Sequence, residues 1–207
     1  MSLGGLLFAA GYDRLMAASE RGGLARHRQA LLAGATGRVL EVGGGTGANL
    51  PYYGRSVSEL VIAEPDPFMR RRLACRLRGY PIPAEVLGAT AEALPCASGS
   101  FDCAVVTLVL CTTADPQRAL AEVRRVLKPG GRLYFIEHVR SEDRAIARWQ
   151  DRLRAPWAFL ARGCQCNRST LEHLRATGFT VTALGRDGLP RAPFFARPLV
   201  IGVAARS

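Results

Sequence analysis

Short apolar runs alternate with segments of helical periodicity along the whole chain. The apolar runs are rich in valine, leucine and isoleucine, which favours strands. The run at residues 101–110 is the longest and is typical of a strand buried on both faces. We predict seven strands, at residues 38–42, 59–65, 83–89, 101–110, 131–139, 179–185 and 198–206.

Helical start and stop signals lie between these strands. The pairs Asp66–Pro67 and Asp115–Pro116 each place an N-cap before a proline at the first helical position. Ser169 with Glu172 three residues later predicts a capping box. The expected helices span residues 24–34, 66–79, 115–131, 144–161 and 169–179. Pro156 is expected to interrupt the fourth of them.

Regular alternation of strand and helix predicts an α/β fold. Parallel strands joined by helical crossovers give a sheet that is covered on both faces. A length of 207 residues suits one domain with a substantial core. We find no repeat or linker.

A glycine-rich loop follows the first predicted strand, and it contains Gly43, Gly44, Gly45 and Gly47. In a dinucleotide-binding G-x-G-x-x-G loop the third glycine comes one residue later. A P-loop would end in G-K-[S/T], whereas Gly47 is followed by Ala-Asn. Both phosphate-binding interpretations are therefore weakened, and a simple glycine turn stays open.

Two acids flank this loop and change its interpretation. Glu41 lies just before the glycines, where a buried carboxylate needs a cation or hydrogen-bond donors. Glu64 ends the second strand, where an acid can accept hydrogen bonds from ribose hydroxyls. A cofactor with a ribose, an ammonium and a sulfonium would satisfy both.

Four ordered stretches resemble the class I S-adenosylmethionine-dependent methyltransferases: EVGGGTGANLPYY, AEPDPFM, AEALPCASGSFDCAVVTLVLCTTADP and EVRRVLKPGGRLYFIEHV. The resemblance runs over residues 24–139 and continues more weakly to the C-terminus. Within that superfamily the chain resembles the ubiquinone-biosynthesis-like branch. The stretches TLVLCTTADP, FIEHV and GCQCNRSTLEHLRATGF are similar to methyltransferase-like proteins that methylate thiols.

The resemblance implies a single-domain, Rossmann-like doubly wound sheet of about seven strands with helices on both faces. It also implies S-adenosylmethionine as the cofactor and S-adenosylhomocysteine as the product. On this interpretation residues 1–23 form an N-terminal helical cap and residues 24–139 the cofactor-binding core. Residues 140–207 then supply the substrate-side helices and the last strands.

By position, the resemblance assigns cofactor contacts to Tyr12, Glu41, Gly43, Gly44, Gly45, Gly47, Asn49, Glu64, Pro65, Asp66, Thr90, Ala91, Glu92, Thr107 and Leu108. Relatives often have an aspartate where Thr90 stands. At the contact to the adenine amino group this chain therefore departs from the family pattern, and Glu92 is the candidate substitute.

The methyl acceptor is less defined than the donor. A thiol ionises near pH 8.5 and so demands less of a catalytic base than a phenol or hydroxyl does. His138 and Cys111 are the candidate catalytic residues, although each is also explained as a packing residue. A small-molecule thiol is the favoured acceptor. Methylation of a quinone or phenolic metabolite on carbon or oxygen, RNA methylation, and cofactor binding without turnover stay open.

Composition adds limits on partners. The net charge of +11 comes almost entirely from scattered arginines, because Lys128 is the sole lysine. A nucleic-acid partner is not expected, since no concentrated basic face with stacking aromatics is evident. Cys164 and Cys166 lack further ligands at metal spacing, so no metal is expected. The oligomeric state is not indicated.

The cysteine content and the N-terminal stretch bear on localisation. Six cysteines without a secretory signal favour the cytoplasm. Residues 1–16 are expected to form an amphipathic helix that packs on the body. Membrane-bound relatives carry a longer apolar anchor, so we expect no transmembrane segment here, and peripheral membrane contact stays open.

Overall fold

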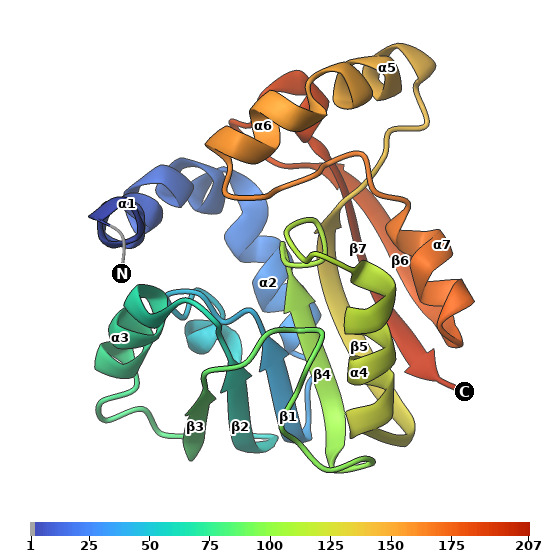
Figure 1. Ribbon diagram of the computed structural model, residues 1–207. Helices are drawn as coiled ribbons and strands as arrows, with labels where there is room; N and C mark the ends of the chain where they lie inside the picture. The colour runs from blue at the N-terminus through green and yellow to red at the C-terminus, as the bar shows by residue number, and fades with distance from the viewer. Residues whose placement is uncertain (1–2) are drawn as a thin grey trace.

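The computed structural model describes residues 3–207 and contains one seven-stranded sheet in the order β3-β2-β1-β4-β5-β7-β6 (Figure 1). All seven predicted strands are present. They are β1 Gly37–Val42, β2 Val57–Ala63, β3 Ala84–Leu87, β4 Phe101–Thr107, β5 Leu127–His138, β6 Phe179–Gly188 and β7 Pro198–Arg206.

The sheet is mixed, which corrects the prediction of a wholly parallel one. Strands β1 to β5 pair in parallel, whereas β7 runs antiparallel to both β5 and β6. The connection from β6 to β7 contains only the short 3-10 turn η3, Phe194–Ala196. Without a crossover helix the chain turns back on itself, and this gives an antiparallel pair.

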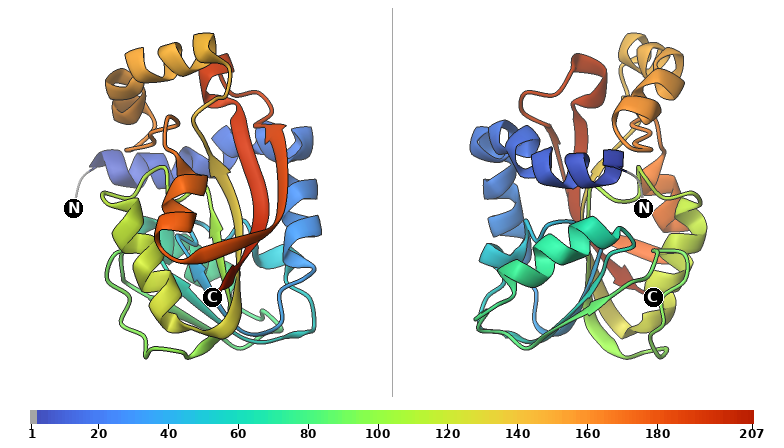
Figure 2. Two further views of the ribbon diagram at one scale, coloured as in Figure 1. Left: turned by 90° about the vertical axis from the view of Figure 1, so that its right-hand side faces the viewer. Right: turned by 60° about the vertical axis from the view of Figure 1, so that its left-hand side comes forward.

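Helices cover both faces of the sheet, as expected. Figure 2 shows α2 and α3 on one side of the sheet, and α4 and α7 on the other. The helices are α1 Leu3–Ser19, α2 Ala25–Leu32, α3 Pro67–Arg76, α4 Pro116–Val126, α5 Arg144–Arg152, α6 Arg154–Leu160 and α7 Thr170–Ala176. A π-helical turn, Glu20–Leu24, joins α1 to α2. Met1 and Ser2 of the predicted cap lie outside the described residues.

Two cap predictions are confirmed and one is wrong. The side chain of Asp66 accepts hydrogen bonds from two backbone N–H groups at the start of α3, and Asp115 does the same for α4. Ser169 precedes α7 but makes no side-chain cap bond, because its ψ of 62° departs from the usual extended cap geometry. The capping box with Glu172 is therefore not formed.

Several element boundaries differ from prediction by a few residues, and three of the differences have a clear physical reason. The break in the helical segment at 144–161 falls at Leu153 instead of Pro156. Pro156 lies in the first turn of α6, where a missing N–H leaves no hydrogen bond unmade. Helix α4 ends at Val126, since Leu127 is already extended and pairs with β4. Strand β4 ends at Thr107, because the next residue adopts a left-handed conformation.

Each face of the sheet has its own apolar core. Leu120, Val123 and Leu174 of α4 and α7 pack on one face, and Leu31 and Leu32 of α2 pack on the other. The strands are therefore buried on both sides. The parallel strands all end at the edge where α1 and α6 lie (Figure 1), and this edge receives the predicted site residues.

Candidate functional site

The glycine loop holds its backbone against β2 and against the turn that follows β4. Gly43 has a φ of 70°, and a Cβ there would lie 2.3 Å from Cγ2 of Val109. A Cβ on Gly44 would lie 2.2 Å from Cγ2 of Ile62. Gly45 has a φ of 54°, yet a Cβ on it would meet nothing within 4 Å. The loop is thus tightly packed at Gly43 and Gly44 and borders open space at Gly45.

Glu64 lies beside that open space. One carboxylate oxygen accepts a hydrogen bond from the Gly45 N–H at 2.8 Å, and the other accepts one from the Asp66 N–H at 2.8 Å. Burial raises the pKa of Glu64 although both bonds favour its charged form. Each oxygen keeps a lone pair for a further donor.

Glu41 lies beneath the loop with its partners supplied by the protein. Its oxygens accept hydrogen bonds from Asn49 Nδ2 at 2.9 Å and from the Tyr53 hydroxyl at 2.8 Å. Burial raises the pKa of Glu41 to about 7, against the effect of both bonds. The donors required by a buried carboxylate at this position are therefore Asn49 and Tyr53.

A buried arginine connects this carboxylate to the end of β4. Arg28 Nη1 donates to Asn49 Oδ1 at 2.7 Å and to Thr107 Oγ1 at 3.0 Å. Its Nε donates to Glu20 at 3.1 Å, and its side chain is only 4% exposed. A buried guanidinium needs hydrogen-bond acceptors around it. Arg28 therefore fixes the orientation of Asn49 and Thr107, which accept its hydrogen bonds.

Sequence reasoning missed Arg28, although a signal was present. Arg28 lies four residues after Leu24 and four before Leu32, and both leucines are fully buried. This spacing places all three on one helical face. An arginine on an otherwise apolar face was the indication of a buried, paired cation.

A cavity of about 570 Å³ lies beside the loop. Residues of α1, α2, α3 and the 3-10 turn η2, Leu50–Tyr52, contribute to its lining. Tyr12 and Arg28 line it together with Gly47 and Ala48 of the loop. Burial raises the pKa of the Tyr12 hydroxyl. The predicted tyrosine of the N-terminal helix thus adjoins the glycine loop.

The turn that follows β4 is anchored by Glu137. Leu108 has a φ of 58°, a conformation that is strained for a residue with a side chain. The Glu137 carboxylate accepts backbone hydrogen bonds from Val109, Leu110 and Cys111 at 2.7, 3.0 and 3.4 Å. Burial raises its pKa to about 7 despite these bonds. Glu137 therefore holds the turn in place.

The two candidate catalytic residues are both buried behind this turn. His138 follows Glu137, burial lowers its pKa, and its Nδ1 has no hydrogen-bond partner among the described residues. A hydrogen bond to Cys164 and burial together raise the pKa of the Cys111 thiol. Both groups are therefore neutral near pH 7.

The three predicted contact residues in the segment after β3 have different surroundings. Thr90 is exposed and Ala91 is buried. Glu92 accepts hydrogen bonds from the backbone N–H groups of Ala114 and Asp115 at 2.8 and 3.3 Å. One oxygen of its carboxylate is thus engaged at the start of α4.

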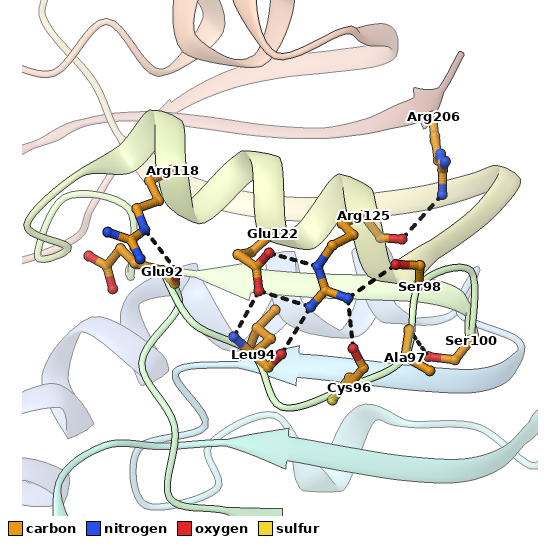
Figure 3. Close-up of polar contacts among 10 residues, drawn as sticks. All are labelled: Glu92, Leu94, Cys96, Ala97, Ser98, Ser100, Arg118, Glu122, Arg125 and Arg206. Carbon is orange, nitrogen blue, oxygen red and sulfur yellow. Dashed lines mark hydrogen bonds and ion pairs between the residues drawn. The ribbon is translucent and has the colours of Figure 1, made fainter.

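Helix α4 fixes the rest of that segment. Arg125 donates to the carbonyls of Leu94 and Cys96, at 2.9 and 2.7 Å, and to Glu122 of its own helix (Figure 3). Glu122 accepts the Leu94 N–H at 3.0 Å. These bonds give a loop without regular structure a fixed course along the edge of the site.

Pro65 and Asp66 lie at the start of α3, next to Glu64. One oxygen of Asp66 caps the helix, and the other lies 3.4 Å from a guanidinium nitrogen of Arg162. Arg162 follows α6, so this contact connects the two sides of the strand-end edge. The arrangement brings Gly45, Glu64 and Asp66 together, whereas Glu92 is hydrogen-bonded to the start of α4.

Two absences concern only the described residues. Among residues 3–207 no three histidine, cysteine or acidic side chains are arranged to hold a metal ion. Within the same range no helix is both long and apolar enough to cross a membrane.

Comparison with known proteins defines the class. Residues 40–135 match a family model described as a methyltransferase domain. A solved S-adenosylmethionine-dependent methyltransferase from Thermotoga maritima, named as a possible histamine N-methyltransferase, has a TM-score of 0.74 and 23% sequence identity, covering 98% of both chains. The chain belongs to the class I S-adenosylmethionine-dependent methyltransferases.

Two human proteins provide the more specific similarity. The chain is 33% identical to thiol S-methyltransferase TMT1B over 84% of its length and 74% of that protein. It is 33% identical to thiol S-methyltransferase TMT1A over 94% of its length and 81% of that protein. The chain is thus an enzyme of the methyltransferase class whose cofactor is S-adenosylmethionine.

Proposed function

We propose that the protein transfers the methyl group of S-adenosylmethionine to the sulfur of a small-molecule thiol. The observation that carries this proposal is the similarity to two thiol S-methyltransferases, which extends over most of the chain. It therefore includes much of residues 140–207, beyond the cofactor-binding core, where we expect the acceptor to bind.

The residues at the strand-end edge fit the cofactor. The space above Gly45 admits a ligand against bare backbone, and Glu64 beside it has lone pairs for ribose hydroxyls. Arg28, Asn49 and Thr107 form a hydrogen-bonded polar cluster, which we assign to the methionine part of the cofactor. We assign the adenine end to Pro65, Asp66, Thr90 and Ala91, and we give Glu41 a positioning role.

The cofactor supplies a methyl group already activated by a sulfonium. The protein's own contribution is alignment, because in-line displacement depends on the approach of the two reacting atoms. The turn at Leu108, held by Glu137, forms the wall at this point. Tyr12 of α1 adjoins the glycine loop from the other side.

A thiol acceptor suits the neutral groups of this site. A thiol needs little assistance to ionise near neutral pH, whereas a phenol with a pKa of about 10 needs a stronger base. His138 is buried with a lowered pKa, so it is available as an uncharged base. We keep His138 and Cys111 as the candidate residues at the acceptor end.

The test is a panel of thiols, phenols and quinols incubated with labelled cofactor and analysed by mass spectrometry. We expect methyl thioethers from at least one class of thiol, and no product with boiled enzyme. Methylated phenols or quinols without any thioether would instead establish the oxygen- or carbon-methylating alternative. Cofactor binding without any product would indicate a non-catalytic protein.

We also propose the cytoplasm as the site of action. The described cysteines are all free, as expected in a reducing compartment. Fractionation of expressing cells, with the thiols alkylated at lysis, tests this. Recovery with the membrane fraction, or with disulfides, would contradict it.

A further inference from the structure

Three thiols from distant parts of the chain meet behind the candidate active site. Cys111 lies in the turn after β4, and Cys164 and Cys166 follow α6. A backbone hydrogen bond of 2.8 Å from the Gln165 N–H to the Cys111 carbonyl joins the two segments. All three cysteines are buried and free.

The chain makes an uncommon turn to place Cys164 there. Arg162 and Gly163 have φ values of 54° and 94°, so two consecutive residues adopt left-handed conformations. For Arg162 this costs about 1 kcal/mol. The turn brings the segment back against the 111–113 region, where a Cβ on Gly163 would lie 3.6 Å from the Thr112 carbonyl oxygen.

The pKa of one thiol in the cluster shifts in the opposite direction to those of the other two. Hydrogen bonds from Cys111 and then Cys166 lower the pKa of Cys164, and the pKa values of both donors are raised. Trp157 and His138 lie near Cys164, and a hydrogen bond from Trp157 also lowers its pKa. The buried His138 Nδ1 has no hydrogen-bond partner among the described residues. This environment favours a thiolate at Cys164.

We propose that Cys164 is an oxidative modification site, which hydrogen peroxide converts into a reversible disulfide with Cys111. The Cys164 thiolate attacks one oxygen of hydrogen peroxide, the O–O bond breaks, and a sulfenic acid forms. The hydroxide that leaves takes up a proton from solvent and becomes water. The Cys111 thiol then gives up its proton and attacks the Cys164 sulfur, which expels a second water. Two thiols lose two electrons, and one peroxide becomes two waters.

We take Cys111 as the partner because its hydrogen bond to Cys164 has the larger effect on the Cys164 pKa, and that of Cys166 comes second. Cys166 packs with Phe195, Ala196 and Trp157 in a separate apolar cluster. Cys111 instead belongs to the turn whose N–H groups Glu137 binds. A disulfide bond of about 2.05 Å is shorter than the hydrogen bond that it replaces between the two sulfurs. The turn beside the methyl-transfer site then shifts.

The first test reads the bond without reference to activity. The reduced full-length protein is treated with hydrogen peroxide, alkylated, digested and analysed by mass spectrometry. We expect a peptide pair joined through Cys111 and Cys164, which dithiothreitol separates. A bond between Cys164 and Cys166, or no bond at peroxide levels that oxidise free glutathione, overturns the proposal.

The second test uses activity, and this part alone rests on the proposed function. A shift of about 1 Å in a reacting geometry can cost 10²-fold in rate, so we expect peroxide to lower methyl transfer at least about tenfold, reversibly. Cys164→Ser should remove the response, whereas Cys75→Ser, at an exposed cysteine, should keep it. An undiminished response in Cys164→Ser contradicts the inference. If no thiol is methylated, the mass spectrum still decides whether the disulfide forms.

Discussion

At Gly45 the absence of a side chain leaves space for a ligand beside the glycine loop. Its neighbours Gly43 and Gly44 are required by packing, since a Cβ on Gly43 would clash with Val109 of the turn after β4 and one on Gly44 with Ile62 of β2. Gly45 has no such neighbour, and its N–H is bonded to Glu64. A glycine that faces open space beside a buried carboxylate is best explained by the ligand that occupies this space.

Replacement of Gly45 by alanine tests that explanation. The left-handed conformation should cost about 1 kcal/mol of stability, and the added methyl group should weaken S-adenosylhomocysteine binding at least about tenfold. Isothermal calorimetry measures the affinity, and urea unfolding measures the stability.

Gly99 is the matched control for this substitution. Its φ is 63°, and a Cβ there also meets nothing within 4 Å, but it lies in the turn before β4, away from the strand ends. Gly99→Ala should lose similar stability and keep full affinity. Equal affinities in the two variants would show that the space above Gly45 is not the cofactor site.

The site residues that could be predicted from the sequence lie close together along the chain, whereas those that were missed make contacts between distant segments. The glycines belong to one continuous loop and Glu64 to one strand end. Their spacing along the chain is therefore enough to predict where they lie. The Arg28 network joins α2, the glycine loop and β4. Likewise, the chain sequence does not reveal that the Glu92 carboxylate turns toward α4. Contacts between distant segments depend on packing, which a local pattern does not encode.

At the level of elements, aspartate caps position three helices around the site. Asp66, Asp115 and Asp143 each accept hydrogen bonds from two backbone N–H groups at the start of α3, α4 and α5. Only Asp66 also donates its own N–H to Glu64, at 2.8 Å. The α3 cap therefore serves both the helix and the carboxylate proposed to bind ribose.

Alanine substitution of these caps separates the two roles. Each variant should lose about 1 kcal/mol of unfolding free energy, because two N–H groups lose their acceptor. Asp66→Ala should in addition weaken cofactor binding several-fold, whereas Asp143→Ala should not. Asp66→Asn, which keeps a capping oxygen, should restore most of both quantities. If Asp143→Ala weakens binding as much as Asp66→Ala, the special role of the α3 cap is contradicted.

Elements with local signals were predictable, and those set by tertiary contacts were not. The Asp–Pro starts of α3 and α4 are local, and the structure confirms them. The direction of β7 depends on a connection without a helix, and an apolar run carries no direction. The break at Leu153 arises where α5 ends and α6 turns away over the site, while Pro156 is accommodated in a first turn.

For the whole molecule, the buried acids predict an unusual dependence of stability on pH. Burial raises the pKa values of Glu41 and Glu137 to about 7 in the folded protein. The folded state therefore holds protons that the unfolded state releases above its ordinary carboxyl pKa. The stability that each acid contributes is complete below that pKa and is lost as pH rises toward 7. Buried His138, whose folded pKa is lowered, acts in the opposite direction.

Glu41→Gln isolates one of these contributions from the opposing histidine. The amide can accept from Asn49 and donate to Tyr53, so the packing is retained. The variant should resemble the wild type near pH 5. It should become relatively more stable toward pH 8, by up to about 3 kcal/mol for a carboxyl shifted this far, as measured by urea unfolding of the cofactor-free protein. Glu85→Gln, at an exposed carboxyl, controls for the loss of one negative charge. A Glu41→Gln difference that stays constant from pH 5 to 8 would mean that Glu41 is charged throughout. Arg28 would then be its balancing cation, and the buried network would be an ion pair instead of a proton store.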